Sequence, residues 1–229
     1  MTYKIVETFD SIQGEGLWAG TPMSFIRFSQ CPVGGPKGLC SSWDGITFAC
    51  DTGPTPPSRR PGIEWHSYTE VNDTWDDEQL YRHIISRVGR HICFTGGEPL
   101  IYNFDHLFAH LAPRPHIIHI ETSGTANYPD WADICDSQEV HITLSPKLNA
   151  KSVWYKRADE LKFLVHKNTG ARELLELIFV MGWAQRKDRI FLQPLENSTY
   201  KENLTHAIHL CELCDVRLSL QLHKYLDVR

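Results

Sequence analysis

Short apolar segments alternate with amphipathic ones along most of this chain, and that alternation restricts the possible fold more than any other feature. Strands that alternate with helices predict an α/β protein with a mainly parallel sheet, whose strand carboxyl ends gather the functional loops at one rim. In the first predicted helix, Leu80, Ile84 and Ile85 should face the core. The predicted strands are 23–29, 91–94, 116–120, 140–144, 160–165, 190–195 and 217–222, and the predicted helices are 78–88, 171–182 and 199–214.

The composition is that of an ordinary globular protein. A length of 229 residues with 41% apolar content fits a single domain, 1–229. Residues 53–77 are rich in Pro, Ser, Asp and Trp without periodicity, so we expect an irregular excursion there. A net charge of -5 provides no basic surface for direct nucleic-acid binding. We expect a cytoplasmic protein without membrane contact, because no segment is long and apolar enough for a membrane span and the first residues lack the apolar core of a signal peptide.

Three cysteines, Cys31, Cys40 and Cys50, lie in one Gly- and Pro-rich loop, 31–52, directly after the first predicted strand. Thiolates bind zinc and iron–sulfur clusters; a structural zinc site normally has four ligands, whereas a cluster on three cysteines leaves one iron open. The gaps of eight and nine residues match no short zinc pattern and no ferredoxin pattern. This loop alone therefore leaves ordinary loop cysteines as an equal alternative.

The remaining cysteines predict no second site. Seven is an odd number, which favours thiols or metal ligands over a disulfide framework. Cys211 and Cys214 form a C-x-x-C pair, but they fall within the predicted helix 199–214 and are interpreted as helix residues. Cys93 and Cys135 are predicted to be small buried hydrophobic side chains.

A series of short motifs extends from residue 11 to residue 224. Together they resemble the radical S-adenosylmethionine enzymes and, within these, the 7-carboxy-7-deazaguanine synthase family. The motifs are, in order, SIQGEG at 11–16, IR at 26–27, CDT at 50–52, TGGEP at 95–99, ETSGT at 121–125, SPK at 145–147, DELKF at 159–163, LQP at 192–194 and QLHK at 221–224.

The cysteine loop departs from the family pattern at one point. The familiar spacing ends in Cys-x-x-Cys, but the position three before Cys50 is Thr47. Cys40 is the only cysteine between Cys31 and Cys50, so it must be the middle ligand if a cluster forms. The resemblance therefore implies a remodelled cluster loop.

The resemblance implies a fold and an activity. The fold would be a partial, open parallel β/α barrel of about six strands with few helices. The reaction would be ring contraction of 6-carboxy-5,6,7,8-tetrahydropterin to 7-carboxy-7-deazaguanine with loss of ammonia, on the route to queuosine-type bases. The enzyme would be a homodimer that uses a [4Fe-4S] cluster, S-adenosylmethionine, Mg²⁺ and an electron donor such as flavodoxin or ferredoxin.

The resemblance also implies which residues form the site. Arg27 and Glu121 would be catalytic as well as substrate-binding. The cluster ligands would be Cys31, Cys40 and Cys50, the magnesium ligand Thr52, and the S-adenosylmethionine-binding residues Ala49, Cys50, Asp51, Gly96, Gly97, Ser145, Pro146, Lys147 and Gln193. The other substrate-binding residues would be Ile12, Gln13, Gly14, Glu15, Thr95, His223 and, through the terminal carboxylate, Arg229.

Residue chemistry supports two of these assignments. Arg27 is a charged residue in an otherwise apolar strand, which is costly without a partner, and its fork matches a carboxylate. Gly96 and Gly97 permit a close backbone approach to a ligand, although a turn would also require them.

Two alternatives remain open. A glycyl-radical activating enzyme would share the cysteines and the GGEP sequence but would not need SIQGEG or QLHK. A non-catalytic metal-binding regulator would account for the altered cysteine spacing but would leave GGEP, SPK and Glu121 without a role.

Overall fold

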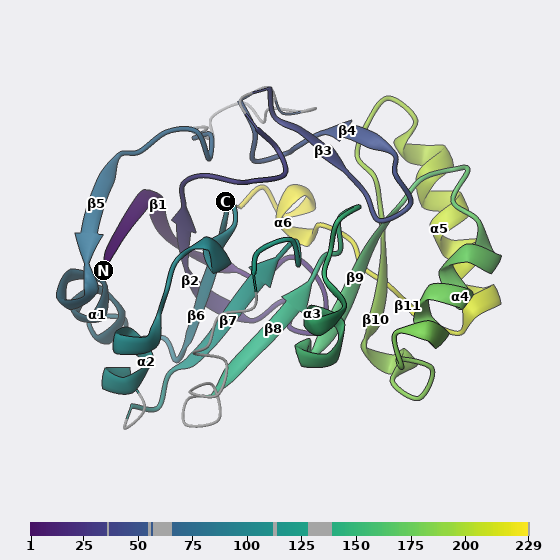
Figure 1. The fold of residues 1–229 in the computed structure, drawn as a ribbon. Coiled ribbons are helices and arrows are strands. Elements are labelled where there is room, and N and C mark those ends of the chain that lie inside the picture. Colours follow the sequence, from purple (N-terminus) through teal and green to yellow (C-terminus); the bar gives the residue numbers. More distant parts are fainter. Residues whose placement is uncertain (36, 55, 57–65, 112–113, 128–138, 229) are drawn as a thin grey trace.

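The structure of the protein is a computed structural model that describes residues 1–229 except 36, 55, 57–65, 112–113, 128–138 and 229. Its main feature is a nine-stranded sheet of order β11-β10-β9-β8-β7-β6-β2-β1-β5 (Figure 1). Every pairing from β2 to β11 is parallel, whereas β1 pairs with β2 and β5 in antiparallel fashion. The strands are β1 (Thr2–Ile12), β2 (Pro22–Phe28), β5 (Asp73–Asp76), β6 (His91–Gly96), β7 (Ile117–Thr122), β8 (Val140–Leu144), β9 (Glu160–Val165), β10 (Ile190–Pro194) and β11 (Arg217–Leu218).

Helices cover one face of this sheet and leave the other for the site. In β6, Ile92 and Phe94 are fully buried in the core that the helices close, while Cys93 and Thr95 point to the opposite face, because side chains alternate along a strand. The helices are α1 (Asp77–Ile85), α2 (Asp105–Leu111), α3 (Ser152–Arg157), α4 (Ala171–Val180), α5 (Tyr200–Cys214) and the short α6 (Leu222–Tyr225), with 3₁₀ turns η1 (Pro99–Ile101) and η3 (Lys187–Arg189).

Most of the predicted elements are confirmed. All seven predicted strands are present in the parallel part of the sheet, and α1, α4 and α5 occupy the three predicted helices. Cys93 is fully buried, Cys211 and Cys214 lie in α5, and Cys135 is outside the described residues. None of the described helices is long and apolar enough to cross a membrane.

Three predictions about the elements are wrong. The last strand ends at Leu218, and residues 222–225 are helical. Ile85 is 38% exposed rather than inward, because it lies at the last position of α1 beside buried Ile84. The excursion 53–77 is not irregular throughout, because β5 extends the sheet against β1, which the sequence analysis also missed.

The cluster loop also contains regular structure. Residues 39–41 and 47–49 form the hairpin strands β3 (Leu39–Ser41) and β4 (Thr47–Ala49). In Figure 1 this hairpin crosses above the carboxyl ends of the parallel strands, with α6 close to it. The hairpin and the strand ends therefore bound the same region of the molecule.

Candidate active site

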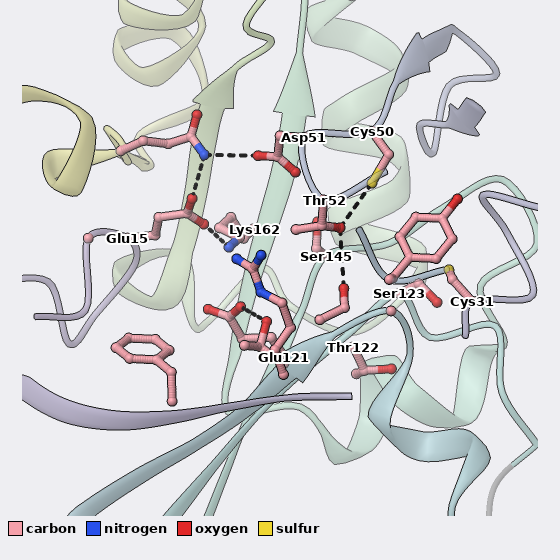
Figure 2. Close-up of a pocket in the computed structure, with 18 of the residues that line it drawn as sticks. Glu15, Cys31, Cys50, Asp51, Thr52, Glu121, Thr122, Ser123, Ser145 and Lys162 are labelled. Atoms are coloured by element: carbon pink, nitrogen blue, oxygen red, sulfur yellow. Dashed lines mark hydrogen bonds and ion pairs between the residues drawn. The ribbon is translucent and has the colours of Figure 1, made fainter. Parts of the chain in front are cut away.

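A cavity of about 300 Å³ lies at the carboxyl ends of the parallel strands and reaches the β3–β4 hairpin. It is lined by all the sequence-predicted site residues except three. Ala49 lies in β4 and Pro146 follows β8, but neither lines this cavity, and Arg229 is outside the described residues. Figure 2 shows side chains from the cluster loop, from β7 and β9 and from the loops after β1 and β8 converging here.

The hairpin brings two cysteines together that are ten residues apart in sequence. Cys40 pairs with Phe48 across the ladder, and the Cys50 N–H donates to the Gly38 carbonyl at 2.7 Å. The Cys40 thiol hydrogen-bonds to Cys50, which lowers the pKa of Cys50 to about 7 and, with burial, raises that of Cys40. The two-stranded ladder thus brings two cysteine thiols together, as a Cys-x-x-Cys turn does in chains with that shorter spacing.

The hairpin is anchored to the sheet through Trp43. Its indole Nε1–H donates to the Leu164 carbonyl at 3.0 Å, and its ring meets Phe163 edge-on with centroids 5.5 Å apart. At the tip, Asp44 Oδ2 lies 3.1 Å from His166 Nε2. These contacts hold the segment between Cys40 and Cys50 against β9.

Tyr68, from the excursion, supports the other end of the cluster loop. Its hydroxyl donates to the Gly35 carbonyl at 2.8 Å, and its own carbonyl accepts from the Gln30 N–H at 2.8 Å. A Cβ on Gly34 would lie 2.1 Å from the Tyr68 hydroxyl oxygen. Glycine is therefore required at 34 for the loop to pass over this ring.

The three sulfurs fit an iron–sulfur cluster better than a single metal ion. Cys31, Cys40 and Cys50 all line the cavity, yet among the described residues no group of three His, Cys, Asp or Glu converges on one ion. A cubane cluster takes each thiolate on a different iron, so its ligands border a volume rather than a point. The donor set of three thiols with an open side toward the cavity fits a [4Fe-4S] cluster.

The glycine pair at the end of β6 packs tightly against the end of β2. A Cβ on Gly97 would lie 1.9 Å from the Gln30 carbonyl oxygen, and Gly96 has a φ of +108°. Gly97 and Glu98 donate their N–H groups to the carbonyls of Phe28 and Gln30, respectively, at 2.9 and 2.8 Å. The pair therefore joins the TGGEP loop to the residue before Cys31, which is a structural requirement independent of any ligand.

Glu98 fixes the neighbouring loop. Its side chain is fully buried and accepts hydrogen bonds from the Thr122 hydroxyl at 2.8 Å and the Ser123 N–H at 2.9 Å. Burial raises its pKa, and these donors oppose that effect. Glu98 thus ties the loops after β6 and β7 together.

Arg27 projects from β2 toward the cavity and has a partner in the adjacent strand. Its Nη1 lies 3.1 Å from Glu7 Oε1. Burial lowers the pKa of Arg27, and Asp51 and Glu121 act in the opposite direction. Its buried Nε has no hydrogen-bond acceptor within the described part of the chain. A donor in this position suits an anionic group in the cavity.

Glu121 is held by two donors from other elements. Thr95 Oγ1–H donates to one carboxylate oxygen at 2.7 Å, and Gln13 Nε2–H donates to the other at 3.1 Å (Figure 2 shows the first of these). The Gln13 amide oxygen in turn accepts from the Glu15 N–H at 3.1 Å. These hydrogen bonds hold the SIQGEG segment across the carboxyl ends of β6 and β7.

The SPK segment meets the hairpin. Lys147 Nζ donates to the carbonyl and hydroxyl oxygens of Ser145 at 3.0 and 2.9 Å, and Lys147 forms a β-bridge with Ser42. Burial lowers the pKa of Lys147, whereas Cys40 and Cys50 act to raise it. A half-buried cation therefore lies beside the thiols.

Comparison with known proteins identifies the family. No family model matches the chain. It is 34% identical over 239 residues to the 7-carboxy-7-deazaguanine synthase of Buchnera aphidicola, and 32% identical over 246 residues to that of Escherichia coli K12, with 100% of each chain covered in both cases. This chain belongs to the 7-carboxy-7-deazaguanine synthase family. The crystal structure of QueE from Escherichia coli superposes with a TM-score of 0.67 at 28% identity, covering 97% of this chain and 95% of that one.

Family membership confirms the radical S-adenosylmethionine type of partial barrel that the motifs predict. The parallel part has seven strands in the described chain, of which the two-residue β11 is the shortest, and β1 and β5 add an antiparallel edge. Membership of this family implies a [4Fe-4S] cluster and S-adenosylmethionine, and the three thiols, Gly97 and Lys147 line one cavity.

Three predicted ligand-binding residues have neighbours that the synthase sequence pattern did not indicate. Gln193 lies near Glu15, with Nε2 3.4 Å from Glu15 Oε1. His223 is in α6, and a Cβ on Gly14 would lie 2.1 Å from its Nδ1. Thr52 donates to the Gly96 carbonyl at 3.3 Å and lies 3.3 Å from Cys50 Sγ.

The cavity of this synthase is also lined by Lys162, Gln221 and Glu7, which the motif pattern did not predict. Lys162 contacts Glu15, and Gln221 Nε2–H donates to Glu15 Oε1 at 2.7 Å and to Asp51 Oδ2 at 3.2 Å (Figure 2). Lys162 and Gln221 belong to the DELKF and QLHK motifs, so a charged or amide residue within a motif was the available signal.

Proposed function

We propose that this chain converts 6-carboxy-5,6,7,8-tetrahydropterin to 7-carboxy-7-deazaguanine, as a carbon–nitrogen lyase of its family. The observation that carries the proposal is one cavity lined both by three thiols and by the polar side chains of Gln13, Glu15, Arg27 and Glu121. A cluster-bound cofactor and a polar heterocycle with a carboxylate would therefore meet in the same enclosed space.

The cofactors would be held by the loop side of the cavity. Cys31, Cys40 and Cys50 would bind the cluster, and Gly97, Ser145 and Lys147 would contact S-adenosylmethionine together with the other residues assigned above. When bound, the reduced cluster and S-adenosylmethionine supply the radical that removes a hydrogen atom from the substrate. The β3–β4 hairpin and Trp43 would keep water away from that step.

The substrate would be held by the strand ends. Arg27 would bind the carboxylate with its free Nε and a guanidinium nitrogen, since a guanidinium fork matches a carboxylate. Glu15 and Gln13 would bind the 2-amino-4-oxo edge of the pterin ring, because a carboxylate accepts hydrogen bonds from the N–H groups of that edge. Glu121, fixed by Thr95, would orient the ring at the reacting carbon.

Thr52 would help to hold Mg²⁺. Magnesium takes few protein ligands and completes its octahedron with water and substrate oxygens, so one hydroxyl beside the substrate carboxylate is sufficient. The Thr52 hydroxyl lines the cavity near Gly96. Asp51 is the nearest carboxylate in the chain sequence.

We further propose that the enzyme is a cytoplasmic homodimer that takes its electron from flavodoxin or ferredoxin. The family resemblance supports these features. Ala49 and Pro146 remain proposed cofactor contacts on the family resemblance alone, because neither residue lines the cavity.

The test is an anaerobic assay. Protein reconstituted with iron and sulfide and reduced with dithionite should produce 7-carboxy-7-deazaguanine, detected by mass, from the pterin with S-adenosylmethionine and Mg²⁺. Cys40→Ala should lose cluster iron and product, whereas Cys211→Ala, in α5, should retain both. Reductive cleavage of S-adenosylmethionine without product would refute the pterin activity and favour the glycyl-radical alternative. A colourless zinc protein would favour the regulator.

A further inference from the structure

Lys162 is a buried cation that the reaction outlined above does not use. It lies in the middle of β9 and is 6% exposed, with its side chain directed into the cavity rather than toward the helices. Its neighbours Leu161 and Phe163 are fully buried on the helical face, so the alternation of the strand fixes this direction. An unpaired lysine ammonium in such a place would be strongly disfavoured.

The ammonium faces carboxylates from three elements. It forms an ion pair with Glu15, from the loop after β1, and is attracted by Glu121 of β7 and Glu160 of β9. Lys147 is the other cation near it. Burial acts to lower the pKa of Lys162, but these carboxylates raise it well above its ordinary value.

Glu15 depends on this lysine for its charge. Burial acts to raise the pKa of Glu15, yet Lys162, with help from His223 and Gln221, lowers it to about 2. The Glu15 side chain is 13% exposed, and its Oε1 accepts from Gln221 at 2.7 Å, while Lys162 contacts Oε2. Without the ammonium, a buried carboxylate reaches its lowest free energy by taking up a proton.

We propose that Lys162 is a positioning residue that keeps Glu15 ionised and oriented to accept both N–H donors of a 2-amino-4-oxo-pyrimidine ring, and so sets the specificity for that ring edge. This inference rests on the proposed function, in which Glu15 binds the substrate. A carboxylate accepts the ring N–H and the amino group side by side, whereas a protonated carboxyl presents one acceptor and one donor. The protonated form therefore matches the N–H and oxo pair of a 2-oxo ring and no longer favours the two donors of a 2-amino ring.

Direct binding separates this role from catalysis. The probes are 6-carboxypterin and its 2-oxo analogue 6-carboxylumazine, titrated calorimetrically into cluster-loaded protein with S-adenosylmethionine. We expect Lys162→Met to bind 6-carboxypterin at least tenfold more weakly at pH 7, which is about 1.4 kcal/mol, and to lose most of its preference over the lumazine. Lys162→Arg should restore the preference, and Lys167→Met, at an exposed pair with Glu202, should match the unaltered protein.

The pH profile distinguishes positioning from a general structural role. In Lys162→Met the pterin affinity should recover as pH rises from 7 to 9, because Glu15 then ionises without its partner. In the unaltered protein Glu15 is ionised throughout that range. His223 faces Glu15, and Glu121, Glu160 and Lys147 face position 162, so the unaltered protein measured over the same pH range is the reference for their titration.

A double-mutant cycle covers the case in which Lys162→Met does not fold. Glu15→Gln with Lys162→Met replaces the ion pair by neutral side chains of similar volume, and its pterin affinity should equal that of Glu15→Gln alone. If Lys162→Met binds and discriminates like the unaltered protein, or if its loss is independent of pH, the inference is wrong. If the unaltered protein binds no pterin, the proposed function fails first and the inference with it.

Discussion

Removal of the Trp43 side chain should loosen the cluster loop without unfolding the sheet. Trp43 connects the β3–β4 hairpin to β9 by the Nε1–H hydrogen bond to Leu164 at 3.0 Å and by an edge-on contact with Phe163. A hydrogen bond of this kind contributes about 1 kcal/mol, and an aromatic pair contributes about 1 kcal/mol beyond its burial. Trp43→Ala should therefore raise the population of detached hairpin roughly thirtyfold, since 1.4 kcal/mol corresponds to a factor of ten.

The loosened hairpin should be visible in two assays. Cys40 and Cys50 flank the hairpin turn, so Trp43→Ala should lose cluster iron to a chelator faster and should be cleaved sooner by protease within residues 41–48. Trp43→Phe keeps a ring on Phe163 but loses the N–H, so its effect should be roughly fivefold, from about 1 kcal/mol. The melting temperature should change less than for truncation of a core residue, because Trp43 is only partly buried where it packs against the large core cluster.

Equal iron loss and equal proteolysis in Trp43→Ala and the unaltered protein would refute the reasoning. That result would mean that the tip contacts, such as the Asp44–His166 pair, hold the hairpin unaided. A large fall in melting temperature would also contradict it, because it would show that the hairpin is part of the global folding unit.

Two further outcomes follow from the structure. Gly97→Ala should cost about 1–3 kcal/mol of unfolding free energy and impair cluster assembly, because its Cβ would lie 1.9 Å from the Gln30 carbonyl oxygen. The control Gly89→Ala, which has open space around it, should change neither property. Chemical denaturation and iron content measure the two effects, and normal cluster assembly in Gly97→Ala would contradict the prediction. The stability that Glu15 contributes should be present above its unfolded pKa of about 4.3 and be lost as pH falls toward its folded pKa of about 2, because a lowered pKa favours the folded state only while the group is ionised. Denaturant unfolding from pH 6 to pH 2 should show a smaller fall in the Glu15→Gln, Lys162→Met double variant, and an identical fall would refute the assignment.

The sequence located the site better than it located the edge of the sheet. Strand ends carry the TGGEP, ETSGT and SPK motifs, and parallel pairing brings strand ends to one rim, so their convergence could be predicted. β1 was missed because a register shift between Ile5 and Glu7 interrupts the alternation, with Ile5 and Val6 both buried in succession. β5 was missed because its four residues, DTWD, have no apolar pattern.

The predicted last strand shows the limit of local pattern. Residues 217–222 alternate apolar and polar side chains, but the pairing with β10 ends at Leu218. The chain then turns so that Leu222 N–H donates to the Gly14 carbonyl at 2.9 Å, which places His223 over the cavity. Tertiary contact with the SIQGEG segment, rather than strand propensity, determines this conformation.

By itself the sequence determined the family, the parallel α/β framework and most of the residues that line the cavity, because motif order and hydrophobic period are local properties of the chain. Only the tertiary structure decided which charges meet. Lys162 and Glu15 are 147 positions apart, and Arg27 finds Glu7 only through strand pairing. Charge pairing in a buried cavity depends on distances across the sheet, which no local pattern encodes.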